Sequence, residues 1–161
     1  MTALLVALWV VVILVIWYVN LYNNIVKLRT TRENAWSDID VQLRMRFDLV
    51  DNLVETVKGY AKHEKSTFQE IVEARNKFGS ATDIKSKAEA DNMLSASLKS
   101  LFALSEAYPE LKSNENFLSL QSELSDIENK IASARRYFNA ATREYNTLIK
   151  QFPANILFHP D

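Results

Sequence analysis

The residue pair with the clearest chemical potential is His63-Glu64, inside the stretch DNLVETVKGYAKHEK that covers residues 51–65. A zinc protease helix needs a second histidine four residues after the first, and the sequence HEKST has none. A di-iron carboxylate bundle needs Glu-x-x-His, but Tyr60 stands three residues before this histidine. The other histidine of the chain is His159. We therefore predict no metal and no cofactor, and interpret His63 as a solvent-facing helix residue.

A second group of polar residues falls within apolar helical stripes. Glu64, for example, stands in the middle of a pattern of apolar residues, spaced by three and four, that runs from Val50 to Phe78. Because a buried carboxylate needs a hydrogen-bond donor, we expect these side chains to form a polar network that fixes helix register. The predicted network consists of Glu33, Asp40, Glu64, Arg135 and Asn139. Use of the same carboxylates in catalysis or metal binding is the alternative, although no nucleophile or phosphate loop accompanies them.

Composition restricts the class of protein. Nineteen Lys and Arg against twenty Asp and Glu give a net charge of -1, which argues against a nucleic-acid partner. The absence of cysteine excludes disulfides, thiolate metal ligands and a cysteine nucleophile. Two glycines and three prolines are too few for the many tight turns of a β-sandwich or barrel. The sequence therefore predicts an all-α fold.

The N-terminal residues have the composition of a membrane span. The first 26 residues carry no charged side chain, and the run from Ala3 to Val19 is apolar without a break. As a helix this run is about 26 Å long, and its extension to Tyr22 approaches the ~30 Å hydrocarbon thickness of a bilayer. Trp17, Tyr18 and Tyr22 suit the membrane interface. No basic residue precedes the run and no small-residue cleavage site follows it, so we expect a retained anchor at residues 1–23.

The first charged residues indicate the orientation of this anchor. Lys27, Arg29 and Arg32 follow the apolar run before the first acidic residue, Glu33. The positive-inside rule therefore predicts a single-pass protein of the cell membrane, with its N-terminus outside and its C-terminal domain in the cytoplasm. The lipid bilayer is its expected partner through residues 3–22.

Capping residues and prolines divide the remaining chain. Gly79-Ser80 predicts a helix end and Thr82-Asp83 the start of the next helix. Pro109 and then Ser113-Asn114 predict a second end and start, and Pro153 closes the last helix. The resulting helices run from the membrane to Phe78, over about 84–107, and over about 114–151. These helices form a predicted domain at residues 24–153, followed by a short tail at 154–161.

The length of the first helix suggests one further break. A soluble helix from Asn24 to Phe78 would be ~82 Å long and would leave much of its apolar face uncovered. A turn or kink near Asp48–Asp51, both residue types that favour N-caps, would give helices of matched length. We therefore expect a transmembrane helix followed by an antiparallel up-and-down four-helix bundle of long helices, with continuation of the helix as the alternative.

The last helix carries the most regular apolar seam, of the kind found in bundles and coiled coils. Large and small residues alternate on it: Phe138 falls between Ala134 and Ala141, which leaves room for a bulky partner such as Trp36. The seam consists of Phe117, Leu120, Leu124, Ile127, Ile131, Ala134, Phe138, Ala141, Tyr145, Leu148 and Phe152.

Four blocks of the sequence, in order, resemble the LemA family of bacterial membrane proteins. The blocks are AWSDIDVQL (35–43), NLVETVKGYAKHEK (52–65), YPELKSNENF (108–117) and ENKIASARRYFNAATREYN (128–146). The resemblance implies a short external N-terminus, one transmembrane helix and a cytoplasmic antiparallel helical bundle without established enzymatic activity. The LemA family also has a magnetosome-associated branch. Family members often have proline where this chain has Asp51, so the expected kink loses its usual cause.

Together these features predict a non-enzymatic, membrane-anchored helical scaffold or protein-interaction module of the LemA type with an unidentified protein partner. The alternatives are a helical bundle that uses buried carboxylates for metal binding or catalysis, and a magnetosome-associated protein of the same type.

Overall fold

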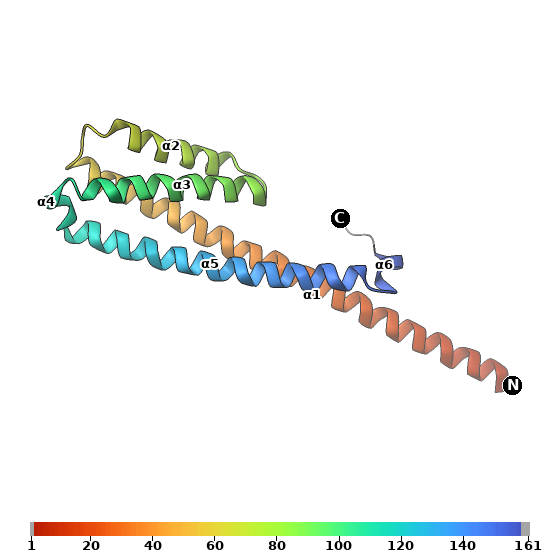
Figure 1. Cartoon of the computed structure of the whole chain (residues 1–161). Helices are drawn as coiled ribbons and strands as arrows, with labels where there is room; N and C mark the ends of the chain where they lie inside the picture. The colour runs from red at the N-terminus through yellow and green to blue at the C-terminus, as the bar shows by residue number, and fades with distance from the viewer. Residues whose placement is uncertain (1, 159–161) are drawn as a thin grey trace. The chain divides into compact units, whose positions relative to one another are not determined.

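The computed structural model describes residues 2–158, and every regular element in that range is a helix, as predicted. Two helices are long, two are of ordinary length and two are single turns (Figure 1). They are α1 (Thr2–Lys58), α2 (Lys65–Ser80), α3 (Ile84–Ser105), α4 (Pro109–Lys112), α5 (Glu115–Lys150) and α6 (Ala154–Leu157).

The predicted helix boundaries are closest where a capping side chain is present. Asp83 is the N-cap of α3: its carboxylate accepts a hydrogen bond from the Ser86 backbone N–H at 2.9 Å, and the Ser86 side chain completes a capping box. Asn114 accepts from the Phe117 N–H at 2.9 Å at the start of α5. Gly79 differs from its predicted role as a helix-ending glycine, because α2 continues through it to Ser80 without a positive φ angle.

The expected break near Asp48–Asp51 is wrong. The α1 helix is continuous through these residues and ends at Lys58, so the chain turns at residues 59–64 instead. The stretch contains no proline or glycine to interrupt the backbone, and Phe47, Val50 and Leu53 keep a buried face through it. Gly59 consequently begins the turn and does not lie in mid-helix.

The contacts of α1 explain why its length is tolerated. The chain divides into two compact units: unit 1 comprises residues 2–40 and 132–158, and unit 2 comprises residues 41–131. Each unit packs other helices against its own segment of α1, so from Ile25 onward an apolar face of α1 is covered in both units, whereas the apolar residues before Leu21 stay exposed.

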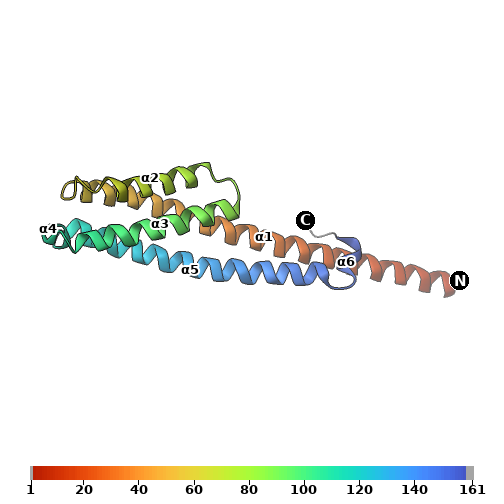
Figure 2. The same cartoon turned by 45° about the horizontal axis from the view of Figure 1, so that its top comes forward.

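Unit 2 holds the larger core. Its buried cluster takes residues from α1, α2, α3, α4 and α5, and Figure 2 shows α2 and α3 lying side by side in this unit. Phe47 of α1 stacks on Phe78 of α2 with ring centroids 4.2 Å apart, and Phe102 of α3 meets Phe117 of α5 edge-on at 6.1 Å. The largest fully buried side chains of the cluster are Leu53, Leu94, Leu101, Leu111, Phe117, Val50 and Val57.

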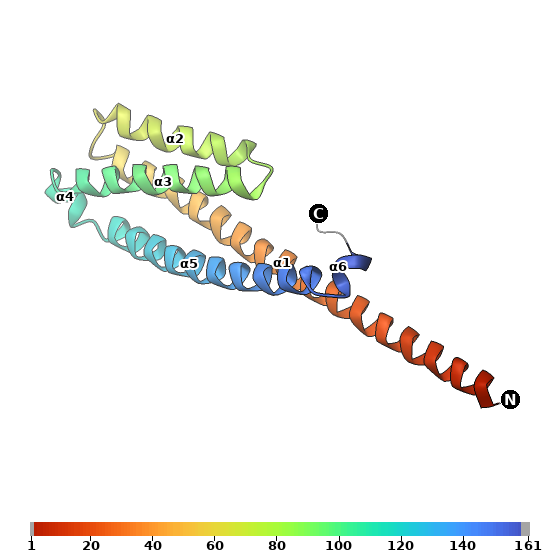
Figure 3. The same ribbon diagram turned by 45° about the vertical axis from the view of Figure 1, so that its right-hand side comes forward.

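Unit 1 is built from α1, α5 and the short α6, which lies beside α1 (Figure 3). Trp36 of α1 contacts Phe138 of α5 with ring centroids 5.8 Å apart, which confirms the partner predicted for that aromatic residue. A small buried cluster contains Ile25, Tyr145, Ile149 and Ala154. The predicted seam fails at its last member, since α5 ends at Lys150 and Phe152 is 80% exposed.

Candidate functional site

The N-terminal part of α1 has the length and composition of a membrane span. Its most apolar 18-residue window has a mean hydropathy of 2.7, and none of that window is buried against the protein. The predicted anchor residues Trp17, Tyr18, Val19 and Tyr22 are all 44 to 48% exposed, and Ala3 is exposed as well. A core helix would bury one face, so this exposure supports membrane anchoring.

The three cationic residues after the anchor all lie on α1, but their side chains have three different environments. Lys27 is exposed, and its carbonyl accepts a hydrogen bond from the Thr31 hydroxyl at 2.9 Å. Arg29 pairs with Glu33 at 3.0 Å on the surface. Arg32 is half-buried and places its guanidinium 4.8 Å from the centre of the Tyr145 ring. The predicted network member Glu33 is therefore used in a local, solvent-exposed pair.

The remaining members of the predicted network are divided between the units. Glu64 belongs to unit 2, where it is half-buried at the N-cap of α2, and the Tyr108 hydroxyl lies 3.4 Å from its Oε1. Asp40, Arg135 and Asn139 belong to unit 1; the first two are half-buried and the third is exposed. The ion pair that we expect Arg135 to form within this network, with Glu64, Glu33 or Asp40 as its partner, stays a prediction. Double-mutant cycles of Arg135→Met with each acid changed to Gln or Asn would test it.

The structure holds a buried ion pair that the sequence pattern did not single out. Arg46 of α1 donates from Nη1 to Oδ1 of Asp91 in α3 at 2.6 Å, and both side chains are 4% exposed or less. Its Nη2 lies 3.8 Å from Glu128 of α5, and its Nε is buried without a hydrogen-bond partner among the described residues. Three helices thus meet at one guanidinium inside unit 2.

The positions of these two residues carry a recognisable signal. Arg46 lies three residues after Leu43 and four before Val50, both of which are buried. Asp91 likewise lies three residues before Leu94 and seven before Leu98. One arginine and one aspartate on the buried faces of different helices are best stabilised by each other.

His63 is exposed, as predicted, but it lies in the turn between α1 and α2 and not on a helix. Its carbonyl accepts a hydrogen bond from the Lys65 N–H at 2.9 Å. Within residues 2–158 no group of three or more His, Asp or Glu side chains is placed to hold a metal ion. His159, the other histidine, lies outside the described residues.

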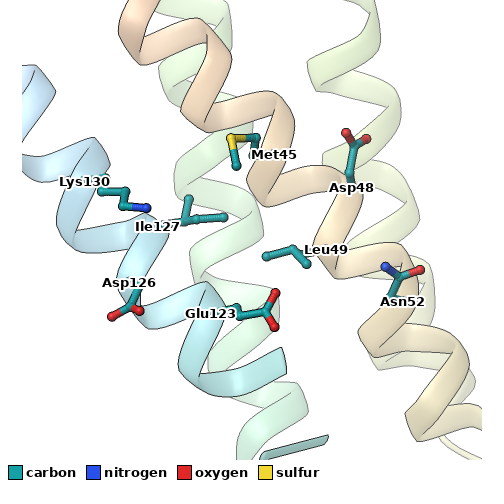
Figure 4. Close-up of a pocket in the computed structure, with 8 residues that line it drawn as sticks. All are labelled: Met45, Asp48, Leu49, Asn52, Glu123, Asp126, Ile127 and Lys130. Atoms are coloured by element: carbon teal, nitrogen blue, oxygen red, sulfur yellow. The ribbon is translucent and has the colours of Figure 1, made fainter. Parts of the chain in front are cut away.

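The candidate functional site is a groove on unit 2 between α1 and α5, with a volume of about 360 Å³. Figure 4 shows Met45 and Leu49 of α1 and Ile127 of α5 directed toward the space between the two helices. Met45 is 45% exposed, Leu49 is half-buried and Ile127 is buried. The floor of the groove is therefore apolar and open to contact with another molecule.

The rim of this groove is mainly acidic. Asp48, Glu123 and Asp126 contribute three carboxylates, against the single ammonium of Lys130, and Asn52 completes the lining. All four charged residues are exposed. An apolar floor between helices with an acidic rim has the chemistry to receive an amphipathic segment that carries basic residues beside its apolar face.

Comparison with known proteins gives one family. The family model described as the LemA family matches residues 35–159. The magnetosome protein MamQ of Magnetospirillum gryphiswaldense is 26% identical over 84% of this chain and 60% of its own length. The protein LemA of Metamycoplasma hominis is 25% identical over 86% of this chain and 64% of its own length. The chain thus spans somewhat less than two thirds of these relatives.

Proposed function

We propose that this chain, which belongs to the LemA family, is a non-enzymatic membrane-anchored scaffold that binds a protein partner on the cytoplasmic side. Residues 3–22 of α1 span the cell membrane in this proposal, and the basic residues after them hold the remainder inside.

One observation carries the proposal: a single helix supplies both the anchor and one wall of the groove. The α1 helix contains the exposed apolar window near the N-terminus and also Met45, Asp48, Leu49 and Asn52. A partner that occupies the groove is therefore linked to the membrane through one continuous backbone. The partner that fits best is a helical segment with apolar anchors and a basic flank, because it complements both the floor and the rim.

Photo-crosslinking in native membranes tests this proposal. A photoreactive amino acid at Met45 probes the groove, and the same group at Val72 of α2 is the matched control, since these side chains are 45 and 50% exposed. We expect a discrete adduct at Met45 that is absent at Val72 and is weakened by Asp48→Lys with Glu123→Lys. Equal adducts at both positions, or none at Met45, would contradict the groove as the binding site.

The relatives support a second candidate within the same architecture. Proteins named MamQ from Magnetospirillum gryphiswaldense and Paramagnetospirillum magneticum carry the magnetosome in their names, and they match at 26 and 27% identity. The identity to the Metamycoplasma protein LemA is nearly the same, at 25%, so similarity alone does not select this role. Co-fractionation with magnetosome membranes in the source cells, compared with the plasma membrane, distinguishes the two candidates.

A further inference from the structure

The segment after α5 packs against the part of α1 that immediately follows the anchor. Phe158 lies beside Tyr22, with ring centroids 6.1 Å apart and planes tilted by 41°. Ala154 is buried in the cluster that includes Ile25 and Ile149, with Leu21 packed against it. The tail predicted at residues 154–161 is thus ordered up to Phe158, as far as the described residues extend.

The distribution of side chains on α6 is the reverse of that expected in water. Its sequence is ANIL, and the smallest apolar residue, Ala154, is 1% exposed. The larger Ile156 and Leu157 are 65% and 46% exposed, and Phe152 just before the helix is 80% exposed. A helix surrounded by water buries its large apolar residues first. Three large apolar side chains therefore face outward at one end of unit 1.

The position at which α6 packs on α1 indicates which surroundings the exposed side chains of residues 152–157 meet. Tyr22 ends the apolar anchor, and Ile25 is three residues further on, a rise of about 4.5 Å. The polar headgroup layer on each side of a bilayer is roughly 5 to 8 Å thick. The part of α1 that contacts Ala154 and Phe158 is therefore within the headgroup layer when the anchor spans the membrane.

We infer that residues 152–157 form a second membrane contact, in which Phe152, Ile156 and Leu157 insert into the headgroup region of the leaflet that α1 has just left. This inference rests on the proposed function, specifically on residues 3–22 spanning the bilayer. Exposed Lys27 and Lys150 lie two residues after Ile25 and one residue after Ile149 of the buried cluster, and they suit the anionic lipid phosphates of that surface. The occupant of the apolar patch is the lipid surface itself.

Single-cysteine labelling of the full chain in vesicles tests the inference. The chain has no native cysteine, so Ile156→Cys or Leu157→Cys carries one environment-sensitive fluorophore. Vesicles of phosphatidylcholine and phosphatidylglycerol contain a lipid with a nitroxide quencher near the headgroup end of its acyl chain. We expect severalfold stronger quenching at these positions than at Val72→Cys, an exposed apolar site on α2. Aqueous iodide should show the opposite order.

Two further variants separate the possible outcomes. Val19→Cys reports on the anchor, because it lies three residues before Tyr22, near the depth of the quencher, and is 47% exposed. Quenching there without quenching at Ile156 or Leu157 overturns the second contact and leaves the anchor intact, whereas no quenching at Val19 overturns the anchor as well. Protection from iodide at Ile156 without lipid quenching indicates contact with a second copy and also overturns the inference. In Phe152→Cys, the added changes Ile156→Asp and Leu157→Asp should abolish lipid quenching, since all three side chains are exposed and Ala154 and Phe158 are untouched.

Discussion

At the scale of single residues, the Arg46–Asp91 pair is the feature on which stability should depend most strongly. The two groups are 2.6 Å apart and almost fully buried. Changing either Arg46→Met or Asp91→Leu should lower the free energy of unfolding by about 3 to 5 kcal/mol, because the remaining buried charge loses its closest partner. The measurement is urea unfolding of the detergent-solubilised chain, followed by helical circular dichroism.

The double variant Arg46→Met with Asp91→Leu is the decisive comparison for this pair. With both charges removed, stability should recover much of the loss, since no isolated buried charge remains. Losses that simply add in the double variant would show that the two residues act independently. Arg44, which is exposed on the same helix, provides the matched control as Arg44→Met.

Gly79 offers the opposite kind of residue-scale prediction. It lies within α2 with an ordinary helical φ angle, and a Cβ atom added there would meet nothing within 4 Å. Gly79→Ala should therefore stabilise the protein by about 0.5 to 1 kcal/mol, because alanine loses less backbone entropy in a helix. Gly59→Ala is the control: its Cβ would lie 3.3 Å from the Thr56 carbonyl oxygen, so no such gain is expected. Thermal midpoints of the two variants give the comparison.

Predictions from the sequence were confirmed at the residue scale where a pattern of side-chain sizes allowed a single interpretation. The Trp36–Phe138 contact followed from a large residue between two small ones. The sequence is less decisive for charged residues, because a charged side chain such as Glu33 or Arg46 can pair with an opposite charge on its own helix or on another helix. Only the three-dimensional packing shows that Glu33 is satisfied by Arg29 on the surface while Arg46 reaches across to α3.

At the scale of elements, the start of α3 should be sensitive to acid. The pKa of Asp83 is held below its ordinary value of 3.8 because the Ser86 N–H and then the Ser86 hydroxyl donate hydrogen bonds to its carboxylate. The charged form is thus favoured in the folded state, and its contribution is present above that pH and lost as the pH falls through the lowered folded pKa. The advantage of the native chain over Asp83→Ala should shrink as the pH falls below about 3.8.

Asp83→Asn is the matched variant for this experiment. Asparagine is a good N-cap residue but does not titrate in this range, so its advantage over alanine should not change with pH. Thermal midpoints of the three proteins, compared between neutral pH and the acid limit of folding, give the answer. An advantage of the native chain that stays constant with pH would mean that the carboxylate charge has no part in the cap.

Helix identity was predictable, but the position of one turn was not. The caps at Asp83 and Asn114 are local signals, and the helices that follow them begin within a residue of the prediction. The turn between α1 and α2 has Gly59 but no proline, and Glu64 caps α2 without a side-chain hydrogen bond to its backbone. Because these local signals are weak, the position of the turn depends on where α2 can pack on α1. The apolar periodicity of the sequence does not reveal that packing.

At the scale of the whole molecule, the anchor and the packed units should be separable. A fragment that begins near Asn24 lacks the exposed apolar window and keeps both buried clusters. We expect it to be soluble without detergent and predominantly helical, because its stability comes from packing between helices and not from the membrane. Circular dichroism of the fragment, with urea unfolding as the test of cooperativity, is the measurement. A fragment that is unfolded or contains substantial strand would refute this.

The basic residues after the anchor predict the orientation of the whole molecule in the membrane. The cations Lys27, Arg29 and Arg32 lie within ten residues of the anchor, in the region where basic residues set topology. Arg29 is paired with Glu33, but acidic residues contribute little to this rule, so the bias should hold.

Fusions at the C-terminal residue Asp161 report the side directly. A fluorescent protein that matures in the cytoplasm should be bright there, and alkaline phosphatase, which requires export, should be inactive. Changing Lys27, Arg29 and Arg32 to Gln while adding lysines before Ala3 should weaken or invert this pattern, because the positive charge then lies on the other flank of the same apolar segment. A native chain with active phosphatase would place the groove outside the cytoplasm. The partner would then have to be sought among exported proteins, although the anchor itself would stand.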